Sequence, residues 1–136
     1  MANKKIEEIE GIGPANGEKL RAAGIANTDA LLERCCTKSG RKEIAEATGI
    51  SASSILKWAN MADLFRINGV AGEFAELLEC AGVDTVKELA TRNAENLTAK
   101  LTEVNDEKKL TRRTPNDAAV KDWIEQAKSL PAKIEH

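Results

Sequence analysis

The sequence predicts an all-α protein built from two copies of one helical unit. Helix formers such as Ala, Leu, Glu and Lys are abundant, whereas the 136 residues include only five Val, two Phe, two Trp and no Tyr. Ala alone contributes 21 residues, so small side chains are expected to dominate the interior. A chain of this length buries a core without disulfides. We therefore expect about nine or ten short helices packed as one compact array.

The chain repeats itself at an offset of 58 residues. Ile9, Gly11, Ile12, Glu18, Leu20, Ala23, Gly24 and Leu31 correspond to Ile67, Gly69, Val70, Glu76, Leu78, Ala81, Gly82 and Leu89. Later the offset grows to 65, so that Ile55, Trp58 and Ala62 correspond to Val120, Trp123 and Ala127. This pattern predicts repeats at 1–64 and 65–136, with residues 62–67 as a shared junction and each tryptophan anchoring the core of its own copy.

Capping residues and helix breakers predict the individual helices. In the first copy a short apolar helix is expected to end near Glu10, followed by helices over 14–23, 28–34, 39–47 and 51–65, the last capped by Ser51. In the second copy helices are expected near 73–81, 84–91 and 95–104. A charged loop follows around 107–114, and the last helix is expected to have Thr114 as its N-cap and to end before Pro131, with 132–136 frayed.

One glycine-rich turn of the first copy has a sequence pattern that suggests a binding site. The run Ile9-Glu10-Gly11-Ile12-Gly13-Pro14, followed by Ala23-Gly24-Ile25, resembles the helix-hairpin-helix motif, whose turn reads apolar-Gly-apolar-Gly. Gly11 and Gly13 permit backbone angles denied to other residues, and Ile12 fills the gap between the helices. The N–H groups of Gly13, Ala15 and Asn16 open the next helix, where unpaired amides and the helix dipole favour an anionic oxygen.

In helix-hairpin-helix proteins this turn grips a DNA phosphate without reading bases. The resemblance implies that role for Gly11, Ile12, Gly13, Ala15 and Asn16, with Lys19 and Arg21 one to two turns away, and weak sequence preference. A purely structural interpretation is that the same turn closes two helices tightly, with Gly17 small enough to let their backbones approach.

The second turn departs from the pattern because Ala71-Gly72 replaces Gly13-Pro14. Its helix opens with Glu73 and Glu76, which complement the helix dipole and repel a phosphate. This copy is expected to be structural or protein-binding.

Two further basic or helical patterns offer alternatives. Lys108, Lys109, Arg112 and Arg113 form the densest basic cluster, although acidic residues just before it weaken its field, so it is a secondary candidate for phosphate contacts. The stretch 41–58 resembles a DNA-reading helix-turn-helix, with Ser53, Lys57 and Asn60 on the outer face of a recognition helix. Only one of those three is basic, and Thr48-Gly49-Ile50 is also interpreted as a degenerate second hairpin.

Nearly the whole chain resembles an uncharacterised bacterial family of tandem helix-hairpin-helix domains that carries only an unknown-function label. The resemblance rests on Gly11-Ile12-Gly13, Ala23-Gly24-Ile25, Thr48-Gly49-Ile50, Asp63-Leu64-Phe65-Arg66, Gly82-Val83-Asp84 and Trp123. It implies a fold and assigns no reaction. Some relatives are described as related to the helix-hairpin-helix part of flap nucleases, but the acidic residues that bind metal there have no counterpart here, so cleavage is not predicted.

Composition narrows the function classes. The formal charge is −2 and the one histidine is His136, so no His-based catalytic or metal cluster is expected, and no enzyme activity or cofactor is predicted. Cys35, Cys36 and Cys80 are expected to be small core residues in a cytoplasmic protein, and no membrane span is expected. We expect a binding module that contacts double-stranded or branched DNA through the first hairpin. The alternative is a protein-interaction or scaffolding module with an exposed apolar patch near Cys35 and Cys36.

Overall fold

The structure, a computed structural model, describes residues 5–9, 11–70 and 72–134. Over these residues the protein contains eight α-helices, one turn of 3₁₀ helix and no strand. The elements in chain order are η1 (Ile6–Glu8), α1 (Gly13–Ala22), α2 (Thr28–Cys35), α3 (Lys38–Thr48), α4 (Ala52–Leu64), α5 (Gly72–Cys80), α6 (Val86–Ala90), α7 (Ala94–Lys108) and α8 (Asp117–Ser129). The all-α prediction is confirmed.

The ends of α1 and α5 have the same geometry. Gly24 follows α1 with φ of +92°, and Gly82 follows α5 with φ of +94°. The N–H of Ile25 donates to the Leu20 carbonyl, and the N–H of Val83 donates to the Leu78 carbonyl, both at 2.9 Å. This is the glycine-terminated helix end in which the next apolar residue folds back onto the helix. The sequence-based prediction of these two helix ends is confirmed.

Three helix boundaries differ from the expectation. The helix expected before Glu10 is only the short turn η1. Thr114 does not cap α8, because the helix begins at Asp117 and the Asn116 side chain accepts the Ala119 N–H at 2.8 Å. Asn and Thr both serve as caps, and the one closer to the helix satisfies the amide. Helix α7 runs beyond 104 to Lys108 and ends where Lys109 adopts the left-handed conformation.

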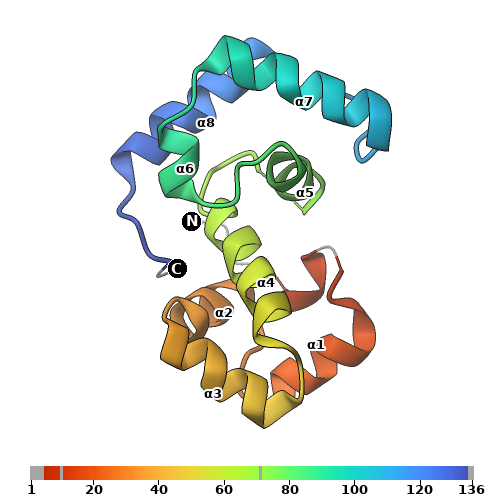
Figure 1. The fold of residues 1–136 in the computed structure, drawn as a ribbon, viewed down its shortest axis with the longest axis vertical. Helices are drawn as coiled ribbons and strands as arrows, with labels where there is room; N and C mark the ends of the chain where they lie inside the picture. The colour runs from red at the N-terminus through yellow and green to blue at the C-terminus, as the bar shows by residue number, and fades with distance from the viewer. Residues whose placement is uncertain (1–4, 10, 71, 135–136) are drawn as a thin grey trace.

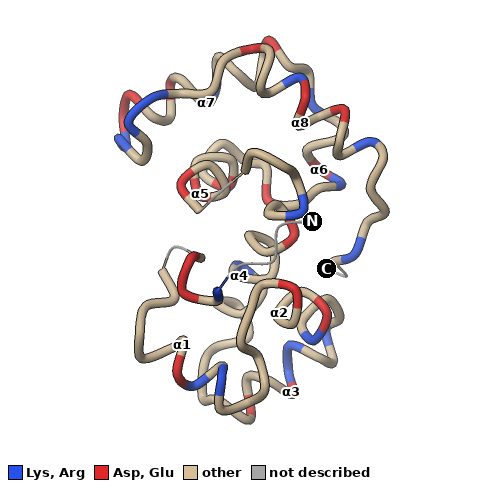
Figure 2. Tube along the Cα trace, turned by 180° about the vertical axis from the view of Figure 1, so that it is seen from behind, with Lys and Arg blue, Asp and Glu red and all other residues tan. Residues whose placement is uncertain are grey.

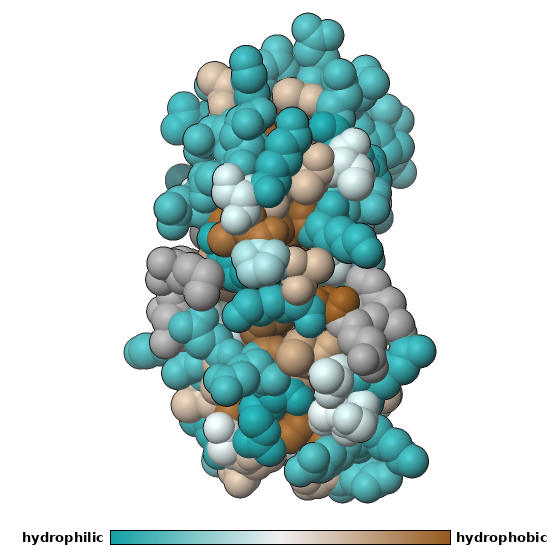
Figure 3. Space-filling view, turned by 90° about the vertical axis from the view of Figure 1, so that its left-hand side faces the viewer, coloured by the Kyte–Doolittle hydropathy of each residue, from teal (hydrophilic) through white to brown (hydrophobic). Residues whose placement is uncertain are grey.

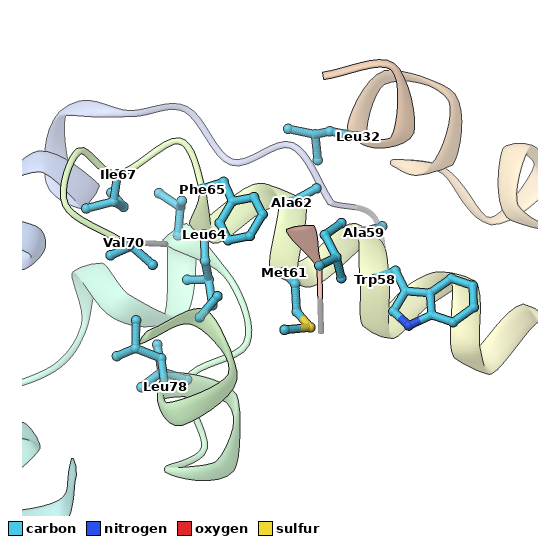
Figure 4. Packing of buried hydrophobic residues seen from close by; sticks show 14 of the residues in the cluster. Leu32, Trp58, Ala59, Met61, Ala62, Leu64, Phe65, Ile67, Val70 and Leu78 are labelled. Carbon is cyan, nitrogen blue, oxygen red and sulfur yellow. The ribbon is translucent and has the colours of Figure 1, made fainter. Parts of the chain in front are cut away.

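Helix α4 is the central element of the fold. Figure 1 shows it running between one half that contains α1, α2 and α3 and another that contains α5, α6, α7 and α8. It packs against α2 and α3 in the first half and against α5 in the second, and every residue from Trp58 to Leu64 is buried. In Figure 4, Leu64 points toward Leu78 of α5, while Leu32 of α2 lies on the other side of α4. The buried apolar residues of both halves form one core cluster.

Each tryptophan packs beneath a glycine turn. Trp58 and Trp123 are 5% and 4% exposed, so the expectation that they anchor the core is confirmed. The indole Nε1 of Trp58 lies 3.8 Å from the position of a Cβ built on Gly11, and Nε1 of Trp123 lies 3.0 Å from the equivalent position on Gly69. The absence of a side chain at these glycines leaves room for the indole edge.

A buried ion pair joins the end of α4 to α6 and to the C-terminal segment. The Arg66 Nη1 donates to Asp63 Oδ1 at 2.6 Å, and both side chains are at most 3% exposed. Asp63 Oδ2 also accepts the Val86 N–H at 2.8 Å. The Arg66 Nη2 donates to the Pro131 carbonyl at 2.6 Å. Of the residues expected to fray, Ile134 packs against the core, Ala132 and Lys133 are exposed, and residues 135 and 136 lie outside the described part.

Candidate functional site

The first glycine turn has the backbone geometry that its sequence predicts. Gly11 and Gly13 have φ of +93° and +68°, a region that residues with a side chain adopt only with strain. Between them Ile12 is 2% exposed and belongs to the core, as expected of a residue whose side chain points inward from the turn. Glu10, which precedes the turn in the sequence pattern, lies outside the described residues.

The turn leads directly into an exposed helix N-terminus. Gly13, Pro14 and Ala15 are exposed and Asn16 is half-buried. Ile12 is the N-cap residue of α1 and provides no side-chain hydrogen bond, and the first turn contains no acidic residue. In contrast, α2, α3, α4, α6, α7 and α8 each have an Asn, Ser or Thr at the N-cap whose side chain accepts an amide N–H. Within the described residues, therefore, no side chain caps the start of α1, and the acidic side chain near this helix is that of Glu7, beside Gly17.

The two basic residues predicted to support this turn differ in their surroundings. Lys19 is exposed in the last turn of α1. Arg21 forms an ion pair with Glu7 of η1, in which the two side chains are 44% and 31% exposed. The hydrogen bond from Arg21 lowers the pKa of Glu7 below its ordinary value. Arg21 is thus directed to a carboxylate, and Lys19 is the better placed of the two for an external anion.

Gly17 lies under this ion pair. A Cβ built on Gly17 would stand 2.8 Å from Oε2 of Glu7, so the small residue makes room for a carboxylate side chain. Glu7 belongs to η1, so Gly17 makes room for a side chain from the helical turn that precedes the glycine turn. The sequence held no signal for the contact between Glu7 and Arg21, which are 14 residues apart.

The basic cluster near the end of α7 is exposed and held by a defined loop. Lys108, Lys109, Arg112 and Arg113 are all exposed, and none forms an ion pair with a described residue. The Asn105 side chain fixes the loop, because its Nδ2 donates to the Thr111 carbonyl at 3.2 Å and its Oδ1 accepts the Thr111 N–H at 2.9 Å. In Figure 2 this loop is the blue patch at one end of α7, and red acidic residues gather on nearby α5.

The second glycine turn has a different environment. Gly69 has φ of +98° and Val70 is buried, which matches the geometry of the first turn. A Cβ built on Gly72 would stand 2.6 Å from the backbone carbonyl oxygen of Glu8, so the start of α5 packs against the first half of the molecule. Glu73 is exposed in the first turn of α5, and Ala71 lies outside the described residues. A carbonyl and a carboxylate near this helix end oppose anion binding.

The helix-turn-helix interpretation of 41–58 requires three exposed residues on the recognition helix, and one of them is buried. Ser53 and Lys57 are exposed, but Asn60 is 7% exposed and cannot lie on the outer face of a recognition helix. Lys57 lies 3.9 Å from Glu79, which partly neutralises the one basic residue of that face. Arg41 is buried, with its Nη1 donating to the Cys35 carbonyl at 3.0 Å.

The three cysteines occupy three different environments. Cys35 is fully buried, Cys36 is half-buried and Cys80 is exposed, so the expectation that all three are core residues is wrong for Cys80. Burial raises the pKa of Cys35 to about 11 and also raises the pKa of Cys80 above its ordinary value. Among the described residues no group of three His, Cys, Asp or Glu side chains has an arrangement that holds a metal ion. No helix in the same part of the chain has the length and apolar character of a membrane span.

Comparison with known families gives one match. The sequence model of a domain of unknown function, DUF4332, matches residues 10–130. The chain belongs to the DUF4332 family. No curated protein matches this DUF4332 chain, and no solved structure does. The matched region of the DUF4332 domain includes both glycine turns and the basic loop, so all of the candidate residues lie within it.

Proposed function

We propose that this protein is a non-enzymatic module that binds the DNA backbone with little sequence preference through the turn 11–16. The observation that carries the proposal is the exposed start of α1, which lacks the side-chain cap found at six other helices. Exposed N–H groups at a positive helix end complement a phosphate oxygen. Lys19 adds a positive charge on the same helix. Backbone contacts of this kind give affinity without base recognition.

We further propose that the chain consists of two pseudo-repeats of a double helix-hairpin-helix unit. Three pairs of contacts at corresponding positions support this proposal. Trp58 lies against Gly11 as Trp123 lies against Gly69. Asn27 caps α2 as Thr85 caps α6, which preserves the offset of 58 residues. Arg34 Nη1 lies 3.3 Å from the position of a Cβ built on Gly24, and Nη2 of its counterpart Arg92 lies 3.3 Å from the same position on Gly82.

The basic loop is proposed as a secondary phosphate contact. Its four exposed basic side chains stand on a loop that Asn105 holds in place, so little ordering is required when they meet an anion. Replacing Arg112 and Arg113 together by Glu is expected to weaken duplex binding and to lower the salt dependence.

Salt dependence of duplex binding is the first test. Fluorescence anisotropy with a short labelled duplex is expected to show affinity that falls with salt, with a log-log slope of about −0.9 per phosphate neutralised. Duplexes of different sequence are expected to bind alike. An absence of duplex binding in ~50 mM salt, where counterion release strongly favours association, removes the DNA proposal.

A substitution at the turn separates binding from folding. Ala15→Asp places a carboxylate in the first turn of α1, where it complements the helix dipole and adds about 0.3–1 kcal/mol of stability. The same carboxylate repels a phosphate, so duplex affinity is expected to fall about tenfold or more. Ala118→Asp makes the same change in the first turn of α8 and is the matched control, since Ala118 is exposed. Equal loss of binding in the two variants would contradict a site at α1.

The alternative, a protein-interaction or scaffolding module, is favoured by a hollow beside α2. Leu32, Glu33 and Cys36 line this hollow together with Lys133, and its volume is about 470 Å³. Duplex binding that is absent at low salt, together with a specific protein partner whose binding is lost in Leu32→Asp, supports this function over the first.

A further inference from the structure

The residues after α8 form an extended segment that crosses one face of the molecule. Residues 130–134, which we call the strap, leave the end of α8 and run toward α2 (Figure 1). Leu130 and Ile134 are partly buried against the core, while Pro131, Ala132 and Lys133 are exposed. In Figure 4 the strap is the pale blue ribbon that passes near Leu32. The strap therefore bridges the two halves that α4 joins.

The strap runs past three surface hollows, which we together call the trough. A hollow of about 280 Å³ lies at its start, among Arg66, Asn68, Gln126, Ser129 and Leu130. A second, of about 190 Å³, lies beside Asp63, Thr85, Lys87 and the strap residues 132–134, and the 470 Å³ hollow beside α2 lies at its end. Figure 3, which views this side of the molecule, shows brown apolar atoms between two hydrophilic lobes. Pro131, Ala132 and Lys133 face solvent, so the apolar contacts that hold the strap come from Leu130 and Ile134.

One hydrogen bond anchors the strap. Within the described part of the chain, residues 131–134 form a single hydrogen bond, from Arg66 Nη2 to the Pro131 carbonyl at 2.6 Å. Arg66 keeps its ion pair with Asp63 when this bond is lost, and Asp63 keeps its bond to the Val86 N–H. Release of the strap thus leaves the buried charges paired and leaves the start of α6 satisfied. Among the described residues, the cost is one hydrogen bond and the partial burial of two apolar side chains.

We propose that this trough is a docking site for an extended segment with a Lys followed by an apolar residue, and that the strap closes it. The strap leaves the trough as a unit while the helices remain folded. The strap itself indicates which side chains such a segment needs. Its Lys133 lines the hollow that contains Asp29 and Glu33, and its Ile134 lines the next hollow. A carbonyl that meets Arg66 fixes the register of the extended backbone. This inference does not depend on DNA binding.

The three cysteines provide reporters for strap release. Cys36 lines the trough, Cys80 is exposed far along the chain on α5, and Cys35 is fully buried. Pulses of iodoacetamide with mass spectrometry measure alkylation at each site. Ile134→Ser is expected to raise the Cys36 rate about fivefold or more, because it removes an apolar anchor. Cys35 and Cys80 are expected to keep their rates, which excludes global unfolding and a general change in reactivity.

Leu110→Ser is the matched control, since Leu110 is also partly buried against the core but lies in the basic loop. An unchanged Cys36 rate in Ile134→Ser, or an equal rise at Cys35 and Cys36, would overturn strap release.

Docking is tested by adding a synthetic peptide of residues 129–136 at millimolar concentration to Ile134→Ser. The peptide is expected to slow alkylation of Cys36, and the same peptide with Ser at position 134 is not. Equal effects of the two peptides would overturn the docking site.

Discussion

Nε1 of Trp123 lies 3.0 Å from the position of a Cβ on Gly69, closer than nearly all real Cβ contacts. Gly69 also has φ of +98°, so a side chain there meets both a steric and a conformational penalty. At Gly11 the corresponding distance from Trp58 is 3.8 Å, which is ordinary contact, with a similar φ of +93°. The two glycines therefore have the same backbone conformation, which would strain any residue with a side chain. They differ in how closely the indole of the neighbouring tryptophan approaches.

This difference predicts that an alanine substitution destabilises the protein more at Gly69 than at Gly11. Gly11→Ala is expected to lower the free energy of unfolding by about 1–2 kcal/mol through backbone strain alone. Gly69→Ala is expected to cost about 1 kcal/mol more, because the indole of Trp123 must shift in a packed core. Urea denaturation of both variants measures the difference. An equal loss in the two variants would show that Trp123 moves freely.

Asp63→Asn is expected to cost about 3–5 kcal/mol of unfolding free energy, because it leaves the buried Arg66 without its counter-charge. Replacing both residues, with Asp63→Asn and Arg66→Met, is expected to cost less than the single change, since no unpaired charge then remains. A double-mutant cycle by chemical denaturation checks this. A double variant that loses the sum of the two single effects contradicts coupling within the pair.

The buried thiol of Cys35 predicts a loss of stability at alkaline pH. Its pKa is raised from 9.0 to about 11 by burial, so the folded state holds the proton more tightly than the unfolded state. The stabilisation is complete below pH 9 and is lost as the pH rises through about 11, amounting to at most about 2–3 kcal/mol. Compared with Cys35→Ala, the wild type is expected to lose this much more stability over that interval. Parallel curves for the two proteins would contradict it.

The pair of Glu7 and Arg21 predicts an opposite dependence on acid. The pKa of Glu7 is lowered from its ordinary 4.5 by Arg21, so its contribution to stability is present above that pH and is lost as the pH falls through the lower value. The Tm difference between wild type and Glu7→Gln is therefore expected to be largest near neutral pH and to shrink as the pH falls below 4.5. Glu7→Gln also frees Arg21 and is expected to strengthen duplex binding at low salt, where Glu33→Gln on α2 serves as the charge-matched control.

Lys109 adopts φ of +52° at the end of α7, a conformation that suits glycine better than lysine. Lys109→Gly is expected to raise the free energy of unfolding by about 0.5–1 kcal/mol. Lys108→Gly removes the same charge inside the helix and is expected to lower it by about 1 kcal/mol. Thermal denaturation of the two neighbours distinguishes backbone relief from the loss of a positive charge. A stabilising effect in both would assign the gain to charge.

Local signals in the sequence predicted much of the fold. Ser51 as a cap, Gly24 and Gly82 as helix ends, and Ile12 as a buried plug all rest on interactions within a few residues, where residue type limits the backbone directly. The same reasoning failed at the start of α8, where Thr114 and Asn116, two positions apart, are both acceptable caps. Asn116 is the cap because it directly precedes the first residue of α8, and the preferences of single residue types do not show where a helix begins.

Contacts between distant residues were beyond that reasoning. The charged residue inside the apolar run Leu64-Phe65-Arg66-Ile67 is the one local sign of the buried ion pair, and its partner Asp63 directly precedes that run. Nothing in the sequence indicated that Glu7 pairs with Arg21, which leaves Lys19 as the better placed basic residue. Nor did the C-terminal stretch indicate that Ile134 packs against the core.

By itself the sequence determined an all-α fold, most helix limits and the glycine turn with its buried isoleucine, because backbone preferences and caps act over short distances. Only the tertiary structure decided which charges are neutralised, which helix start stays uncapped and what covers the face of α2. Those outcomes depend on which side chains meet after the two halves pack around α4. Residues that meet in this way can be separated by any number of positions in the sequence, so no sequence pattern reveals them.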